Sequence, residues 1–402
     1  MPTDRPLRIA YLSDQSPLDR NLYSGGNARI HDALCRHAGE VTILPQTWGI
    51  AEPLRRALHR MPEHVTLRAR WRMHYALAPV IAAGLRRPLA QGGFDVVFGA
   101  YALHALAGLR VPRGVVTAFT SDAVQTVYRT SEIGEAFRSS RIGRLSDAWV
   151  EGHETRALRR ADVLIWPSEW LRKATMARYG LPGERGHVVP WGANLDRVPP
   201  PRTPLPLPPH GPLNLLFVGR DWTAKGGPVV LETVQRLRDS GIDARLTVIG
   251  CSPPLPQTPA HTPAPALPHI TVHAQLDKSR PDQMALFDAA MARAHVMMMP
   301  SFESYGFAFC EASAHGVPAL CLRVGGVPVR DGINGHALPP GSGPAEFAAL
   351  LSGFLDDPAA YARLAASTRH EYETRLNWDT WGQTTAALLR DAVARKRSAP
   401  QR

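Results

Sequence analysis

The stretch Ser301-Phe-Glu-Ser-Tyr-Gly-Phe-Ala-Phe-Cys-Glu311 places two carboxylates, Glu303 and Glu311, eight positions apart. The apolar run Val296 to Met299 before it predicts a buried strand, and Pro300 to Gly306 predicts the turn that follows. A helical pattern begins after the turn. The two carboxylates therefore stand on either side of a junction between a strand and a helix.

The helix is expected over Phe307 to His315, because Gly316 and Pro318 end it. Glu303 then lies at the carboxyl end of the strand, and Glu311 lies about one turn into the helix. Open α/β sheets bind ligands at that edge, and a helix N-terminus there offers N–H groups and about half a positive charge to a phosphate. One carboxylate can accept hydrogen bonds from sugar hydroxyls and the other from a ribose. From spacing alone, two solvated acids at a helix start remain an equal alternative.

The composition is that of a globular protein with room for two domains. The chain has 402 residues, of which 44% are hydrophobic and 20% are charged. No apolar run approaches the ~18 residues of a membrane span, and the start of the chain lacks the apolar segment of a signal peptide. The four cysteines lack C-x-x-C spacing, which indicates neither a zinc site nor a disulfide framework. We therefore expect a cytoplasmic protein without a bound metal.

The net charge of +11 comes almost entirely from arginine, since only four of the 46 basic residues are lysine. No stacking platform or recognition-helix pattern accompanies this charge, so we do not expect a nucleic-acid partner. The densest basic segment runs from Arg55 to Arg87 and is partly amphipathic. It could rest on an anionic membrane surface or form a solvated face, and we prefer the solvated face.

Two proline-rich stretches punctuate the chain. Val198 to Pro212 predicts a stiff linker, and Pro253 to Pro268 predicts a surface insertion. On either side of the linker, short β-type runs alternate with helical runs, which is typical of parallel sheets covered by helices. The expected division is a domain at 1–198, the linker at 199–212, a second domain at 213–376, and a C-terminal helix and tail at 377–402.

The expected strands give each half of the chain one doubly wound sheet. They are Arg8–Leu12, Glu40–Leu44, Asp95–Phe98, Val115–Phe119, Asp162–Trp166 and His187–Val189, then Leu213–Val218, Arg245–Ile249, Ile270–His273, Val296–Met299 and Ala319–Leu322. The helix at Asp379 to Lys396 is expected to cross back to the N-terminal domain. The predicted fold class is α/β, with two Rossmann-like domains facing across a cleft.

A glycine-rich turn follows the strand Leu213–Val218. It reads Gly219-Arg-Asp-Trp-Thr-Ala-Lys-Gly-Gly-Pro228 and leads into a helix that begins near Val229. Backbone N–H groups of such a turn can cradle a phosphate, and Arg220 and Lys225 add two cations five positions apart. This combination suits a diphosphate leaving group. A helix cap with two exposed bases is the alternative.

The N-terminal half contributes two weaker signals. Ser24-Gly-Gly-Asn27 precedes a helix at Ala28 to His37, and Gly26 lets the backbone approach a ligand there. Asp122 follows the strand Val115–Phe119, where it can contact a ligand or cap a turn. A tight turn explains the glycine pair equally well. Together with the two cations and two carboxylates above, these residues form a more specific pattern than any one of them.

The pattern resembles the family 4 retaining glycosyltransferases of GT-B fold. The order Ser-Gly-Gly, Gly-Arg-x4-Lys-Gly and Glu-x7-Glu carries the resemblance, which spans nearly the whole chain. Further matching segments are Arg159–Asp162, Pro167–Trp170, Val189–Asn194, Gly325–Pro328, Asp331–Gly335 and Leu376–Trp378. The resemblance implies transfer of a sugar from a nucleoside diphosphate sugar to an acceptor hydroxyl, with retention, in bacterial polysaccharide or glycoconjugate biosynthesis.

The resemblance also implies roles for single residues. The donor would be held mainly by the C-terminal domain, with Arg220 and Lys225 on the diphosphate. Glu303 would bind hydroxyls of the donor sugar, and Glu311 would bind the ribose. Further donor contacts are implied for Gly26, Gly219, Gln275, Leu276, Tyr305, Gly306 and Phe307. Because no Asp-x-Asp triplet occurs, cations and a helix N-terminus are expected in place of a metal, and no other cofactor is expected.

One departure concerns the N-terminal domain. Many family members carry a histidine after the strand matching Val115–Phe119, where this chain has Thr120-Ser-Asp122. Asp122 is therefore assigned to the catalytic set with Glu303 and the two cations, and His104 is a less favoured substitute. An inactive sugar-nucleotide-binding subunit and a nucleotide-sugar epimerase remain alternatives. A dinucleotide oxidoreductase is disfavoured because the first strand-to-helix turn lacks G-x-G-x-x-G. The acceptor is expected to be a sugar, a lipid-linked molecule or a small molecule.

Overall fold

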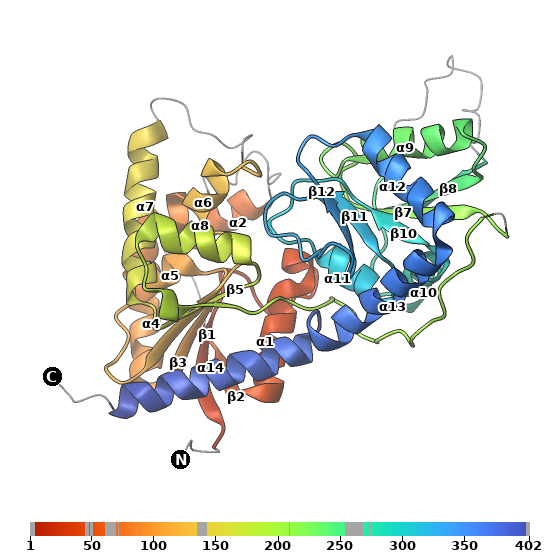
Figure 1. Ribbon diagram of the computed structural model, residues 1–402. Coiled ribbons are helices and arrows are strands. Elements are labelled where there is room, and N and C mark those ends of the chain that lie inside the picture. The colour runs from red at the N-terminus through yellow and green to blue at the C-terminus, as the bar shows by residue number, and fades with distance from the viewer. Residues whose placement is uncertain are drawn as a thin grey trace. The chain divides into compact units, whose positions relative to one another are not determined.

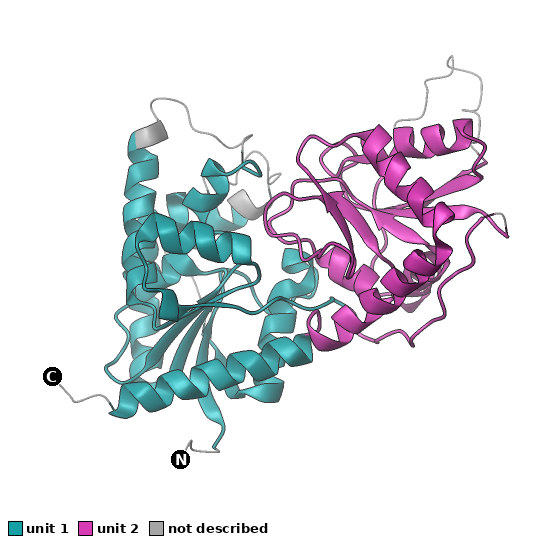
Figure 2. Cartoon of the chain, viewed as in Figure 1, with its two compact units in different colours: residues 1–194, 378–402 teal, residues 195–377 magenta. Residues whose placement is uncertain are grey.

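The computed structural model describes residues 5–44, 48, 51–60, 70, 72–134, 143–208, 210–253, 268–273 and 275–398. The chain divides into two compact units, which Figure 2 colours separately: unit 1 is 1–194 with 378–402, and unit 2 is 195–377. Most of the expected insertion at 253–268, and part of the basic segment at 55–87, lie outside the described residues. Within the described ranges, no helix is long and apolar enough to cross a bilayer.

Unit 1 is built on a parallel sheet of six strands in the order β2-β1-β3-β4-β5-β6 (Figure 1). The strands are β1 (Leu7–Leu12), β2 (Gly39–Ile43), β3 (Val96–Ala100), β4 (Val116–Thr120), β5 (Val163–Trp166) and β6 (Gly186–Val188). The helices are α1 (Gly26–His37), α2 (Glu52–Arg60), α4 (Ala78–Gly92), α5 (Leu103–Gly108), α6 (Gln125–Thr130), α7 (Gly143–Arg160), α8 (Glu169–Tyr179) and α14 (Trp378–Ser398). Every residue of β3 and β4 is buried, as expected for a parallel sheet covered on both faces.

Unit 2 repeats this plan with a parallel sheet in the order β12-β11-β10-β7-β8-β9. The strands are β7 (Leu213–Val218), β8 (Ala244–Ile249), β9 (Ile270–His273), β10 (Val296–Met298), β11 (Ala319–Leu322) and β12 (Gly335–Leu338). The helices are α9 (Gly227–Asp239), α10 (Pro281–Arg293), α11 (Phe307–Ala314), α12 (Pro344–Asp356) and α13 (Pro358–Thr374). The chain winds outward from β7 to β9 and then returns to β10 beside β7. The strand order therefore reverses between β7 and β10, where ligands of such sheets bind.

The C-terminal helix α14 belongs to unit 1 (Figure 2). Trp381 is fully buried, and its ring lies edge-on to Phe98 of β3 at a centroid distance of 6.4 Å. Near the end of the helix, Lys396 Nζ lies 2.5 Å from Asp162 Oδ2 just before β5. The expected return of this helix to the N-terminal domain is therefore confirmed.

The expected strands are all present within two residues, so the predicted fold class is confirmed. The structure adds one strand that we did not expect, β12, which has only four residues and alternates between buried and half-buried side chains. The stretch at 199–212, expected to be a linker, belongs to unit 2 by its contacts. Arg202 donates hydrogen bonds to the carbonyl oxygens of Met291, Ala292 and Ala294 at 3.2, 2.6 and 2.8 Å.

Candidate active site

The glycine-rich turn between β7 and α9 is closed by its own backbone. The N–H of Lys225 donates to the carbonyl of Asp221 at 3.1 Å. Gly226 has φ of +80°, and a Cβ at this position would lie 2.4 Å from the carbonyl oxygen of Pro300. Only glycine fits this close approach between the turn and the end of β10. The turn therefore fixes the backbone of Lys225 beside the loop that carries Glu303.

Gly219 and Arg220 begin the same turn. A Cβ at position 219 would lie 2.8 Å from Lys225 Cγ, so the missing side chain makes room for the lysine stem. Arg220 is exposed, and its guanidinium makes no hydrogen bond or ion pair within the described parts of the chain. The turn thus holds one cation against the protein and presents the other to solvent.

Lys225 and Glu303 form an ion pair between their side chains, Nζ to Oε1. The side chain of Glu303 is 11% exposed, and the Ser301 hydroxyl donates to its Oε1 at 2.8 Å. The backbone of Glu303 also bridges Gly325 in parallel register. The structure therefore brings together the residue predicted for the phosphate and the residue predicted for the sugar, 78 positions apart in sequence.

Glu311 is the fifth residue of α11, and its side chain is only 4% exposed. Its Oε2 accepts a hydrogen bond of 2.6 Å from Lys278 Nζ. Lys278 follows β9 in the segment that also contains exposed Gln275 and half-buried Leu276, for which donor contacts were predicted. No role was predicted for Lys278 itself.

Helix α11 begins beside Glu303. Gly306 is its N-cap with φ of +92°, and a Cβ there would lie 2.7 Å from the ring of Phe309. Tyr305 is buried, and its ring meets Phe307 edge to face at 5.8 Å. The first turn of α11 carries no acidic residue, so its N–H groups remain suited to an anion.

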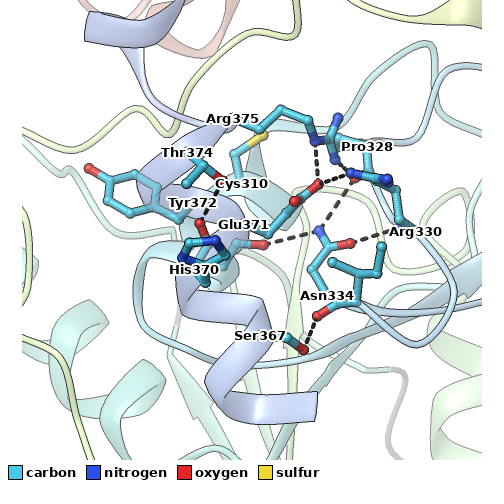
Figure 3. Close-up of polar contacts among 12 residues, drawn as sticks. Cys310, Pro328, Arg330, Asn334, Ser367, His370, Glu371, Tyr372, Thr374 and Arg375 are labelled. Carbon is cyan, nitrogen blue, oxygen red and sulfur yellow. Dashed lines mark hydrogen bonds and ion pairs between the residues drawn. The ribbon is translucent and has the colours of Figure 1, made fainter. Parts of the chain in front are cut away.

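A polar cluster around the buried carboxylate of Glu371 (Figure 3) holds the loop from β11 to β12. Gly325 of this loop bridges the backbone of Glu303. Glu371 of α13 pairs with Arg330 at 3.2 Å and with Arg375 through its Nε. Arg375 also donates to the carbonyl of Pro328 at 2.7 Å. The loop from β11 to β12 is therefore attached to α13 by one carboxylate and two guanidinium groups.

Gly26 and Asp122, the two predicted site residues of the N-terminal half, lie in unit 1. Gly26 is buried and begins α1, directly after the 3₁₀ helix Leu22–Gly25. Asp122 is half-buried and follows β4. Both stand at the carboxyl edge of their sheet, as expected, and their roles stay predictions.

The same edge of unit 1 carries backbone strain that the sequence did not reveal. Tyr23, Ser24 and Tyr101 are the non-glycine residues with positive φ in the described ranges, at 51°, 53° and 58°. The rings of Tyr23 and Tyr101 stack at 4.2 Å, and the Tyr23 hydroxyl donates to Asp14 Oδ2 at 2.6 Å. Backbone strain from a positive φ is common at functional sites, but no sequence pattern predicts it at a tyrosine.

His104, the substitute considered for the histidine of the family, is buried on α5. Its ring stacks on His74 at 4.1 Å, and burial lowers its pKa to about 3. It is therefore a neutral core residue. Within the described residues, no group of three or more His, Cys, Asp or Glu side chains could hold a metal ion.

Two family models match the chain. The model described as Glycosyltransferase Family 4 matches residues 28–197, and the model described as Glycosyl transferases group 1 matches residues 212–357. The chain belongs to the family 4 glycosyltransferases. This confirms the resemblance seen in the sequence and the class of enzyme.

Curated relatives and solved structures agree with this assignment. A D-inositol 3-phosphate glycosyltransferase of Xylanimonas cellulosilytica is 29% identical over 97% of both chains. One from Streptomyces scabiei is 33% identical over 60% of this chain and 56% of its own length.

Among solved structures, sucrose-phosphate synthase from Thermosynechococcus elongatus has a TM-score of 0.66 at 19% identity, covering 97% of this chain and 100% of its own. Anabaena HepE in complex with UDP has a TM-score of 0.58 at 15% identity, covering 96% and 100%. These structures show that the fold is GT-B, as predicted.

Proposed function

We propose that this family 4 glycosyltransferase transfers a sugar from a nucleoside diphosphate sugar to an acceptor hydroxyl, with retention at the anomeric carbon. The observation that carries the proposal is the Lys225–Glu303 pair, which joins the turn after β7 to the turn after β10. The Anabaena structure named for its complex with UDP supports a nucleotide of this class.

The chemistry follows from where charge develops. As the bond between sugar and phosphate breaks, positive charge grows on the sugar ring and negative charge on the departing diphosphate. Lys225, exposed Arg220 and the N-terminus of α11 lie around the same sheet edge and oppose the negative charge. Glu303 accepts hydrogen bonds from sugar hydroxyls, and Glu311 accepts them from the ribose. These cationic groups take the place of a metal in the proposal.

Retention is proposed without a protein nucleophile. The departing phosphate removes the proton from the acceptor hydroxyl on the same face of the sugar, so the new bond forms where the old one breaks. Family membership supports this step. Gly219 and the backbone of residues 305–307 support the phosphate and sugar, and Gln275 and Leu276 border the base.

The acceptor is proposed to belong to polysaccharide or glycoconjugate synthesis at the inner face of the membrane. On α2, Leu54 is 44% exposed, and Arg56 and Arg60 beside it are exposed. Exposed leucine among arginines suits an anionic lipid surface. Flotation with anionic vesicles tests this step, and absence of lipid-dependent binding would instead support a small soluble acceptor.

The experiment for the function as a whole is a transfer assay. UDP-, GDP-, ADP- and TDP-sugars are offered with candidate acceptors, and NMR reads the anomeric configuration of the product. We expect one donor class to react with retention, EDTA to leave the rate unchanged, and Lys225→Ala to lower kcat by about 10²–10³-fold. Inversion, or loss of activity with EDTA, would overturn the proposed mechanism.

A further inference from the structure

We propose that Lys278 is a positioning residue that fixes Glu311 for the donor ribose and thereby makes the site select ribonucleotides over 2′-deoxyribonucleotides. This inference rests on the proposed function, because it concerns the donor site of unit 2. Nothing in the sequence motifs assigns Lys278, which lies 33 positions before its partner.

The carboxylate of Glu311 requires a partner. Its side chain is 4% exposed, and a buried charge without a partner is strongly unfavourable. Lys278 Nζ, 2.6 Å from Oε2, is the donor that the structure gives to this carboxylate within the described residues. Oε1 accepts no hydrogen bond there, so it remains available to a hydroxyl of the ligand.

Lys278 is itself fixed in place. Its Nζ lies 4.2 Å from the ring centroid of Phe287, a fully buried residue of α10, in a cation–π contact. The turn that carries it is closed by Asp277, whose N–H donates to Gln283 Oε1 at 2.6 Å and whose Oδ1 accepts from the N–H of Ser279 at 2.9 Å. The lysine therefore reaches Glu311 from a structured turn at the carboxyl edge of the sheet.

The residue type also fits the role. Only four of the 46 basic residues are lysine, and two of them, Lys225 and Lys278, pair with the two glutamates of one motif. A guanidinium tends to bind both oxygens of a carboxylate, whereas an ammonium is a point charge that binds one. A lysine thus neutralises Glu311 while leaving the second oxygen for the ligand. This gives a physical reason for lysine at both places in an arginine-rich chain.

Selectivity for ribonucleotides follows because a 2′-deoxyribonucleotide leaves one carboxylate oxygen of Glu311 without a hydrogen bond. When a nucleotide lacks the 2′-hydroxyl, the fixed and buried Glu311 carboxylate loses a hydroxyl that would donate a hydrogen bond to it, and nothing replaces that hydroxyl. Sites built to bind a hydroxyl reject analogues without it strongly. If Lys278 is removed, Glu311 is no longer held toward the ribose, and both kinds of nucleotide should bind similarly.

The test is calorimetric binding of UDP, GDP and ADP, each beside its 2′-deoxy form, to the full chain. We expect the wild type to bind one ribonucleotide on the order of 10²-fold more tightly than its deoxy form. In Lys278→Met, the ribonucleotide should bind about tenfold more weakly and the preference should fall to within about threefold. Lys173→Met, which removes a lysine that is 71% exposed on α8, should behave like the wild type.

Two results would overturn the inference. One is an unchanged preference in Lys278→Met, and the other is an equal loss for both nucleotide forms, which would indicate a purely structural role. If Lys278→Met does not fold, Lys278→Gln is measured by the same criteria. A wild type that binds no nucleotide at all would instead contradict the proposed function, so the two failures can be told apart.

Discussion

At the scale of single residues, the ion pair between Lys225 and Glu303 has an energetic consequence. A phosphate that binds Lys225 must compete with a carboxylate that the Ser301 hydroxyl also holds. An intact nucleoside diphosphate sugar removes this competition. Its sugar hydroxyls donate hydrogen bonds to Glu303 while its phosphate binds Lys225. The pair should therefore favour the intact donor over the free nucleoside diphosphate.

Glu303→Gln tests this competition. The free nucleoside diphosphate should bind about fivefold more tightly to the variant, because a partly exposed ion pair contributes up to about 1 kcal/mol. Transfer should fall sharply in the same variant. Calorimetry measures the first effect, and Glu232→Gln, which alters an exposed pair on α9, is the control. Unchanged or weaker binding of the diphosphate would contradict the competition.

Buried His104 of unit 1 predicts a loss of stability in acid. Burial lowers the pKa of His104 to about 3, against about 6.5 in the unfolded chain. Between these values the unfolded chain binds a proton that the folded chain does not. The free energy of unfolding should therefore fall as pH drops below about 6.5, by on the order of 2–3 kcal/mol at pH 4.5. Chemical denaturation across this pH range measures the effect. The free energy of unfolding should depend less steeply on pH in His104→Gln than in His370→Gln, which alters an exposed histidine.

Sequence alone identified the motif residues of unit 2 but not their partners. Glu303 and Glu311 stood out because they flank one strand-to-helix junction, and Lys225 stood out because it lies in the glycine-rich turn of another. Lys278 did not, because its contact with Glu311 depends on how the segment after β9 meets α11. The contact of Ser301 with Glu303 is local, but it depends on how the loop folds and not on residue spacing. The left-handed backbone conformation of Tyr23 and Tyr101 could not be predicted either, since glycine and asparagine are the residues that commonly adopt it.

At the scale of elements, the turn from β7 to α9 depends on one glycine. Gly226→Ala should destabilise unit 2 and weaken donor binding, because its positive φ and the nearby Pro300 carbonyl both oppose a Cβ. The expected cost is about 2 kcal/mol or more. Gly241→Ala, at φ of +85° just past the other end of α9, meets no atom within 4 Å. It should cost only about 1 kcal/mol and leave donor binding unchanged.

Thermal unfolding and nucleotide titration of the two alanine variants separate backbone strain from steric clash. Equal effects at the two positions would show that close approach to Pro300 is unimportant.

Most elements could be predicted, because buried parallel strands are continuous apolar runs. The exception, β12, has four residues beginning with a glycine, which is too short and too mixed for its periodicity to be recognised.

At the scale of the whole molecule, the C-terminal helix makes the stability of unit 1 depend on the last part of the chain. Trp381→Ala should lower the free energy of unfolding by about 3–5 kcal/mol, because the ring is fully buried against Phe98 of β3. Trp149→Ala, on α7, removes a ring that is 43% exposed and should cost much less. Denaturant unfolding measures both. Similar losses in the two variants would mean that α14 contributes little to the core of unit 1.

The proposed function requires that unit 2 bind a nucleoside diphosphate sugar through Lys225, where the strand order of its sheet reverses between β7 and β10. The most direct measurement is calorimetric titration of the wild type and of Lys225→Ala with UDP-, GDP-, ADP- and TDP-sugars. We expect one of these donors to bind the wild type and the variant to bind it at least about 10-fold more weakly, a loss of about 1.4 kcal/mol. Equal affinity in the two proteins, or no binding of any nucleotide sugar to the wild type, would contradict it.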